Sequence, residues 1–238
     1  MNRYAVFFLM AAVIFFASCK SAPQIVGAES DAEVVYRQGR HFFERGDYNE
    51  AEKYFMRVIS EFSFSIYEPF ATVALADTFF QKKEYPSALE VYRRFVKMRP
   101  GHERTPWAEF QIGNCFFEQR PSDFILLPHP SEKDIEVVEK AADQYRHFLR
   151  KYPENEYRNS VMEMLERAEA ILIERDLRVA EYYRKRRKCP AVRMRLKHIS
   201  DNFTITTEKN RKRVASLAAS CPDNNEMEAE VSAEQPNE

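Results

Sequence analysis

The residues whose chemistry could bind a ligand lie in two short stretches. Residues 62–67, Phe-Ser-Phe-Ser-Ile-Tyr, place three aromatic rings within six positions, and Arg93 and Arg94 follow further along the chain. Aromatic rings beside a guanidinium group would suit a peptide that is rich in aromatic side chains and ends in a carboxylate. The same residues would equally suit packing between neighbouring structural elements. The sequence leaves both interpretations open.

No catalytic or metal-binding motif accompanies these residues. The sequence contains no GxSxG, no P-loop, no HExxH and no paired-cysteine metal signature, and its five histidines are scattered. We therefore predict a protein that is not an enzyme, with no catalytic residue and no metal site.

Covalent chemistry is expected at Cys19. Residues 1–18 have the pattern of an export signal: Arg3 precedes the apolar residues 5–17, a stretch too short to cross a bilayer. The small residues before Cys19 resemble a bacterial lipobox, in which the thiol receives a diacylglycerol and the new N-terminus an acyl chain such as palmitate. We expect this lipid and no other cofactor. Lys20, in place of Asp, favours the outer membrane.

A basic stretch lies near the other end of the chain. Residues 184–213 carry 12 Lys and Arg against two acidic residues. An exported lipoprotein meets little nucleic acid, so we expect none as a partner; an acidic protein surface or anionic lipid headgroups fit better. A solvated helix end without a dedicated partner is the alternative. The acidic tail could also fold back on this stretch.

Three cysteines remain after Cys19. An odd number argues against a disulfide framework in an oxidising compartment. We expect Cys115, which lies among aromatic residues, to be a small core residue. Cys189 and Cys221 could pair, but their spacing gives no support for this.

Repeated helical hairpins must position all of these residues. In residues 32–62 two amphipathic patterns meet near Gly46, with Gly39 and Ala51 where two helix backbones would approach closely. The pattern recurs with Ala76, Ala88 and Tyr92, and again with Gly113, Ala141 and Tyr145. The sequence therefore predicts an all-α fold of tetratricopeptide-repeat (TPR) hairpins stacked in a superhelical solenoid.

The predicted organisation follows the chain. A lipidated tether covers 19–31, with Asp31 as the cap of the first helix, and repeats 1 and 2 cover 32–104. Repeat 3 covers 105–155 and contains an insertion at 120–133 whose apolar centre is expected to pack back onto the repeats. A contact with a partner is the alternative for this insertion. A long helix, a degenerate fourth repeat and a capping helix cover 156–220, and 221–238 form an acidic, disordered tail.

This order of elements resembles the BamD (ComL) family, outer membrane lipoproteins of the β-barrel assembly machinery. The most specific marks are residues 62–67 after the first repeat, Arg93-Arg94-Phe95 in the second, and Val179-Ala180-Glu181-Tyr182-Tyr183 at the end of the long helix. Two features depart from the family pattern: Arg187 replaces the usual glycine in the fourth turn, and the fifth repeat stops after one helix.

The resemblance implies a scaffold on the periplasmic face of the outer membrane that promotes the assembly and insertion of β-barrel proteins. Its implied partners are the POTRA region of BamA, other Bam lipoproteins and unfolded outer membrane protein precursors. It makes Phe62, Phe64, Tyr67, Arg93 and Arg94 candidates for binding the client peptide. Candidates for docking BamA lie in the fourth hairpin and the helix after it: Tyr182, Tyr183, Lys209 and Arg211.

Two other classes of TPR protein remain as alternatives. A pilotin-like lipoprotein would promote secretin assembly and co-purify with a secretin. A periplasmic coordinator of cell-wall synthesis would normally lack the lipid at Cys19.

Overall fold

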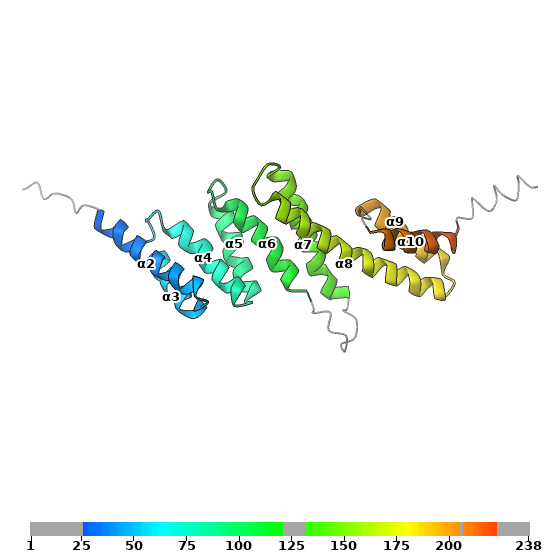
Figure 1. Cartoon of the computed structure of the whole chain (residues 1–238), viewed down its shortest axis with the longest axis horizontal. Helices are drawn as coiled ribbons and strands as arrows, with labels where there is room; N and C mark the ends of the chain where they lie inside the picture. Colours follow the sequence, from blue (N-terminus) through cyan, green and yellow to red (C-terminus); the bar gives the residue numbers. More distant parts are fainter. Residues whose placement is uncertain (1–25, 121–131, 205–206, 223–238) are drawn as a thin grey trace, which may run out of the picture. The chain divides into compact units, whose positions relative to one another are not determined.

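The computed structural model describes residues 26–120, 132–204 and 207–222. This part of the chain is helical, without a β-strand, which confirms the predicted all-α class (Figure 1). The helices are α2 (Val26–Glu44), α3 (Tyr48–Glu61), α4 (Glu68–Gln81), α5 (Tyr85–Met98), α6 (Thr105–Glu118), α7 (Glu132–Lys151), α8 (Arg158–Lys185), α9 (Cys189–Asn202) and α10 (Glu208–Ala219).

The chain forms two compact units, and the division falls within α4. Unit 1 extends to Ala74, and unit 2 begins at Leu75. In unit 1, α2 and α3 pack as an antiparallel hairpin. In unit 2, each helix from α5 to α9 packs against the next, and α10 packs against both α8 and α9.

The α2–α3 hairpin depends on the small residues that the repeat pattern predicted. Ala51 is completely buried, and a Cβ atom added to Gly39 would lie 2.8 Å from Cε1 of Phe55. The two helix backbones therefore approach as closely as the Phe55 ring allows. On the same hairpin Phe42 stacks on Tyr54, with their ring centroids 5.3 Å apart.

Helix α2 begins earlier than predicted. It starts at Val26, so Asp31 lies within the helix and is not its cap, and residues 26–31 are helical where a tether was expected. No proline follows Pro23 until Pro69, so nothing in the sequence prevents helix formation from Val26 onward.

Within the described residues, the turns between α2 and α3, α4 and α5, and α8 and α9 share one backbone conformation. Gly46 has a φ of 80°, Lys83 a φ of 62° and Arg187 a φ of 56°. All three lie in the left-handed region, which glycine enters at the lowest cost. Arg187 therefore makes the same kind of turn as Gly46. The fourth hairpin departs from the pattern in residue type but not in backbone geometry.

In unit 2 the pairing of α6 with α7 repeats the α2–α3 arrangement more tightly. A Cβ atom on Gly113 would lie 2.4 Å from Cε1 of Tyr145. The Tyr145 ring is completely buried, and its hydroxyl donates a 2.8 Å hydrogen bond to Oδ1 of Asn114. The ring is thus held from both sides. Cys115, one residue further along α6, is a free and buried thiol, which confirms its predicted role as a core residue.

The third repeat accommodates part of its insertion by lengthening a helix. Helix α7 has 20 residues, whereas α3, α5 and α9 each have 14. Residues 121–131 are outside the described part of the chain, so the expectation that the insertion packs back stays a prediction. The long helix expected from 156 onward corresponds to α8, which has 28 residues.

The C-terminal helices are joined by a disulfide that the cysteine count did not predict. Cys189 and Cys221 form a disulfide, with their Cα atoms 5.1 Å apart, so the argument against pairing is wrong. Counting cysteines failed because Cys115 is buried inside unit 2 and so takes no part in pairing. The bond joins the first residue of α9 to Cys221, which follows the end of α10 at Ala219. Both helices pack on α8 around a shared core of Ile173, Leu177, Ala180, Val192, Ile199, Leu217 and Cys221.

Candidate functional site

The link between α3 and α4, residues 62–67, is held by two short turns. The amide of Phe62 donates to the carbonyl oxygen of Val58 and closes α3. The amide of Ser65 then donates to the carbonyl of Phe62 (2.9 Å), and Oγ of Ser65 accepts from the amide of Tyr67 (3.1 Å). Serine side chains that bond the backbone two residues on favour turns of this kind. The link is therefore an ordered surface feature.

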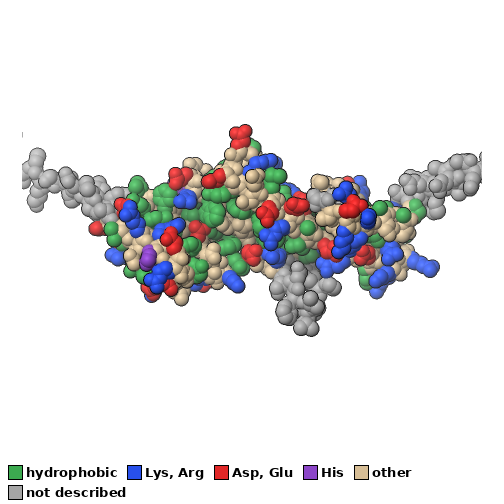
Figure 2. Space-filling view, viewed as in Figure 1, with side chains coloured by type: hydrophobic (Ala, Val, Ile, Leu, Met, Phe, Trp, Pro, Cys, Tyr) green, Lys and Arg blue, Asp and Glu red, His purple; other side chains and the backbone are tan. Residues whose placement is uncertain are grey.

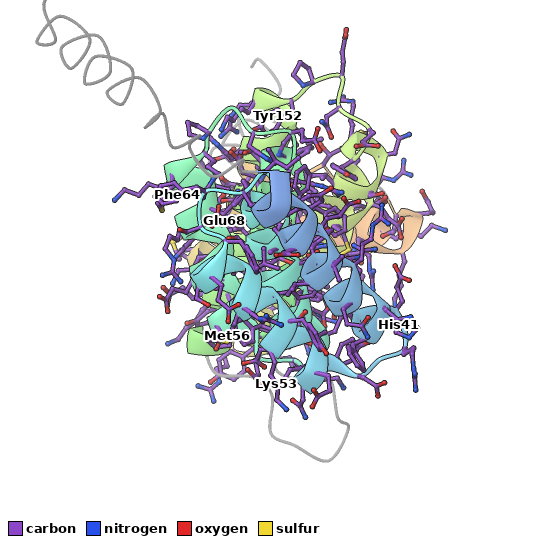
Figure 3. The ribbon with its side chains drawn as sticks, turned by 90° about the vertical axis from the view of Figure 1, so that its left-hand side faces the viewer. His41, Lys53, Met56, Phe64, Glu68 and Tyr152 are labelled. Atoms are coloured by element: carbon purple, nitrogen blue, oxygen red, sulfur yellow. A yellow bond between two sulfur atoms is a disulfide. The ribbon has the colours of Figure 1, made fainter. Side chains whose placement is uncertain are left out.

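The three aromatic residues of the link have different surroundings. Tyr67 faces α2, and its ring centroid lies 5.7 Å from that of Tyr36. Phe62 is half-buried. Phe64, by contrast, is fully exposed (102%), and Ile66 is 66% exposed. Figure 3 labels Phe64 close to Glu68, the first residue of α4. Tyr67 thus fastens the link to the hairpin, while Phe64 and Ile66 present an apolar surface to solvent.

Arg93 and Arg94 lie on α5 and differ in their contacts. The guanidinium carbon of Arg93 lies 5.0 Å from the centroid of the Phe116 ring, a cation–π arrangement. Arg94 is 62% exposed, and its Nη2 lies 3.9 Å from Oε1 of Glu90. An exposed pair at that distance is weak. Arg94 is therefore the more available cation for an incoming carboxylate.

The link and the two arginines were predicted to lie close together, but they belong to different compact units. The link belongs to unit 1, whereas Arg93 and Arg94 belong to unit 2. A single site that contains Phe64 and Arg94 therefore stays a prediction.

The end of α8 presents the first of the predicted docking residues. Tyr182 is 47% exposed, and the guanidinium carbon of Arg186 lies 4.3 Å from the centroid of its ring. Tyr183 instead packs against the core shared by α8, α9 and α10. Of the two tyrosines, only Tyr182 offers its ring to a partner.

Lys209 and Arg211 lie on the exposed face of α10. Nε of Arg211 lies 3.6 Å from Oε2 of Glu208, and Lys209 is exposed. Their helix is fixed by a neighbour, because Nη2 of Arg213 lies 2.9 Å from Oε1 of Glu181 on α8. Docking residues on α10 are thus held in a defined position relative to Tyr182. On the face seen in Figure 2, Lys and Arg side chains gather over α8 to α10.

Sequence reasoning missed a cavity beside this surface. Its volume is about 480 Å³, and it lies between the end of α7, the first half of α8 and the start of α10. Met162, 47% exposed on α8, lines it together with Leu165, Ile173 and Asn210. Its formation depends on where α10 returns to α8, which no local pattern indicates. The spacing of Met162 and Leu165 along one helix face was the only available signal.

Other predicted features fall partly outside the structure. Cys19, the rest of the predicted export signal and the acidic tail lie outside the described residues. Within residues 26–120, 132–204 and 207–222, no cluster of three or more His, Cys, Asp or Glu could hold a metal ion. In the same ranges, no helix combines the length and apolar character needed to span a bilayer.

Comparison with known proteins places the chain in a family. The model of the family described as YfiO, outer membrane lipoprotein, matches residues 28–237. The outer membrane protein assembly factor BamD of Caulobacter vibrioides is 22% identical over 197 residues, which cover 83% of this chain and 62% of that protein. BamD of Vibrio cholerae is 22% identical over 207 residues, or 86% of this chain and 84% of that protein.

Solved structures that are similar to part of this chain include two TPR proteins. The TPR2AB domain of yeast Sti1, in a complex with pHSP90, covers 80% of this chain and 71% of its own, with 12% identity and a TM-score of 0.48. The first TPR domain of human RPAP3 covers 59% of this chain and 91% of its own, with 18% identity and a TM-score of 0.44.

Proposed function

This chain belongs to the YfiO family of outer membrane lipoproteins, and we propose that it is an outer membrane protein assembly factor. In this role it binds unfolded β-barrel precursors and BamA on the periplasmic face of the outer membrane. The observation that carries the proposal is the family match over residues 28–237, together with the assembly factors named BamD among its relatives. The resemblance noted in the sequence is thereby confirmed at the level of the family.

We propose that the client peptide binds at the link between α3 and α4. Phe64 and Ile66 supply exposed apolar surface, and the contact between Tyr67 and Tyr36 keeps the link from rearranging. A preorganised apolar site loses little conformational entropy when it binds an aromatic residue. The exposed guanidinium of Arg94 would bind the terminal carboxylate of the peptide. Phe64 belongs to unit 1 and Arg94 to unit 2, so each contact is tested by its own substitution.

The test measures the affinity of a short fluorescent peptide that ends in phenylalanine, with a free carboxylate in one version and an amide in the other. Phe64→Ser should weaken both versions by roughly tenfold, because it removes the apolar contact. Arg94→Glu should weaken only the carboxylate version. This difference separates the apolar contact from the ionic one.

Matched controls come from α3, on the surface of unit 1. Met56 is 52% exposed and is labelled in Figure 3, so Met56→Ser removes an exposed apolar side chain outside the link. Arg57→Glu reverses an exposed charge that pairs with Glu61 at 2.8 Å. Neither should change the affinity. Unchanged binding by Phe64→Ser and Arg94→Glu would refute the client site.

We propose that BamA docks on the surface formed by Tyr182, Lys209 and Arg211. Tyr182 offers an exposed ring, and the contact between Arg213 and Glu181 holds α10 beside it. Tyr182→Ala combined with Lys209→Glu and Arg211→Glu should lower the recovery of the BamA POTRA region in a pull-down. Met194→Ser on α9 is the control, because Met194 is an exposed apolar residue (61%) outside this surface. Equal recovery with both variants would contradict this assignment.

We also propose that acylated Cys19 attaches the chain to the outer membrane. Six residues separate Cys19 from Val26, the first residue of α2, so the tether reaches roughly 25 Å at most. Cys19→Ala should move the protein from the membrane fraction to the soluble fraction. Membrane association that survived this substitution would contradict the anchor and would revive a periplasmic role.

A further inference from the structure

The turn between α8 and α9 carries a concentration of positive charge. We define the basic turn as residues 184–188, the run Arg-Lys-Arg-Arg-Lys. All five are exposed. Among the residues that the structure describes, no carboxylate pairs with Arg184, Lys185, Arg187 or Lys188, and the guanidinium of Arg186 lies over the ring of Tyr182.

Several basic residues near this turn have a carboxylate within 4 Å, which the turn itself lacks among the described residues. Lys197 pairs with Asp201 at 3.5 Å, and Lys212 pairs with Glu208 at 3.6 Å. Arg195 reaches the buried carboxylate of Asp176. The excess charge of the hairpin is therefore concentrated in the basic turn. Like charges this close repel one another, so a nearby anion would stabilise the turn.

The residues that directly precede the acidic C-terminal segment, Cys221 and Pro222, are held next to the basic turn. The disulfide holds the Cα atom of Cys221 5.1 Å from that of Cys189, which directly follows Lys188. The Cα atoms of Lys188 and Cys221 therefore lie within about 9 Å of each other. One residue later, the carbonyl oxygen of Pro222 accepts a 2.9 Å hydrogen bond from Nη1 of Arg193 on α9.

The segment that starts there has the complementary charge. Residues 223–238 contain six acidic residues and no Lys or Arg. Fully extended, they would reach roughly 50 Å, far more than is needed to cover the basic turn. A segment joined this closely to its target has an effective concentration on the order of millimolar, so even a weak ionic contact would be populated.

We propose that the acidic tail, residues 223–238, binds the basic turn and shields it from anionic partners. An acidic protein surface or a lipid headgroup would then have to displace the tail to bind there. The proposal concerns two segments of one chain and does not depend on the function proposed above.

The test uses a fluorescent peptide with the sequence of residues 223–238, added to the intact chain and to a chain that ends at Pro222. The shortened chain should bind the peptide, and the intact chain should bind it at least about tenfold more weakly, because its own tail occupies the site. Binding should weaken as salt is raised. A peptide in which glutamine and asparagine replace the acidic residues should not bind. Equal affinities for the intact and shortened chains would overturn the proposal.

Two triple variants of the shortened chain locate the contact. Arg184→Gln, Lys185→Gln and Lys188→Gln remove three charges from the basic turn and leave Arg187, whose backbone is left-handed, unchanged. This variant should lose the peptide. Lys209→Gln, Arg211→Gln and Lys212→Gln remove three charges from α10, and this variant should keep it. Similar losses in both variants would show general charge attraction and would overturn the assignment.

A third measurement tests the shielding itself. Vesicles containing phosphatidylglycerol should bind the shortened chain, or a chain with the neutralised tail, more strongly than the intact chain. All chains carry Cys19→Ala here, so that the acyl anchor does not contribute. Equal vesicle binding by intact and shortened chains would show that the tail shields nothing, and this would overturn the proposal.

Discussion

At the scale of single residues, the hairpins depend on where a side chain is absent. Gly39 and Gly113 occupy equivalent positions in the first and third repeats, and each faces an aromatic ring of the partner helix. An alanine at either position would place its Cβ atom less than 3.0 Å from that ring. Cores of this density have no room for an added methyl group without displacement.

Gly113→Ala is expected to destabilise the protein by about 1–3 kcal/mol. The added methyl group would meet the Tyr145 ring, which cannot move away because it is buried and its hydroxyl is bonded to Asn114. This cost exceeds the helix propensity that alanine gains over glycine. Urea unfolding followed by circular dichroism measures the change. Gly101→Ala is the control: a Cβ atom added there would have no neighbour within 4 Å, so no measurable loss is expected.

Replacing Arg187 by glycine should stabilise the fourth hairpin by roughly 0.5–1 kcal/mol. A residue with a Cβ atom loses about 1–2 kcal/mol in the left-handed conformation, and glycine avoids this cost. The unfolded chain is more flexible with glycine, which offsets part of this gain. Lys83→Gly should behave in the same way, while Gly46→Ala should destabilise the first hairpin. Urea midpoints of the three variants test this, and a loss of stability in both glycine variants would contradict the argument.

At the scale of helices, polar contacts connect α8 to both of its neighbours, α7 and α9. Arg146 on α7 pairs with Glu169 on α8 at 2.7 Å, and Arg175 on α8 pairs with Glu139 on α7 at 2.8 Å. The buried carboxylate of Asp176 accepts from Arg195 and lies 2.8 Å from Nδ1 of His198, both on α9. Pairs with both nearest neighbours keep α8 in register.

The disulfide supplies the corresponding constraint for α10. Cys189→Ala with Cys221→Ala should destabilise the C-terminal hairpin by about 3–4 kcal/mol, the value expected for a bond that closes 32 residues. Hydrogen exchange should show faster opening of α9 and α10, with little change in α2 and α3, which belong to unit 1. Equal acceleration throughout the chain would contradict a local role for the bond.

At the scale of the whole molecule, burial couples stability to alkaline pH. Burial raises the pKa of the Cys115 thiol from its ordinary value of 9.0 to about 12, and the carboxylate of Asp77 adds to this. Burial also raises the pKa of Tyr92 and of Tyr145 above the ordinary value of 10.0. In each case the folded state holds the proton more tightly than the unfolded state.

The contribution of these three groups to the free energy of unfolding should therefore be constant below about pH 9. It should fall as the pH rises towards 12. Urea unfolding at several alkaline pH values measures this slope. Cys115→Ala removes one of the three groups, so its stability should fall less steeply with pH than that of the wild type. Identical slopes would contradict the raised pKa of the thiol.

Much of the architecture could be predicted from local pattern. Spacing alone assigns Ala51, Ala88 and Ala141 to helix contacts, and all three are completely buried. Helical periodicity and residue size are local properties of a sequence, so hairpins of this kind are predictable one repeat at a time. The same reasoning identified the aromatic link as a candidate site from residue types.

Other features depend on where segments that are far apart in the sequence meet, and periodicity could not predict them. The bond between Cys189 and Cys221 forms because α10 folds back along α8 and brings its end to the start of α9. The different exposures of Tyr67 and Phe64 follow from the position of Tyr36 on another helix. These contacts join residues that are far apart in the sequence, and no spacing rule encodes them. Each is decided by the packing of whole helices, because burying apolar surface selects which of the available faces meet.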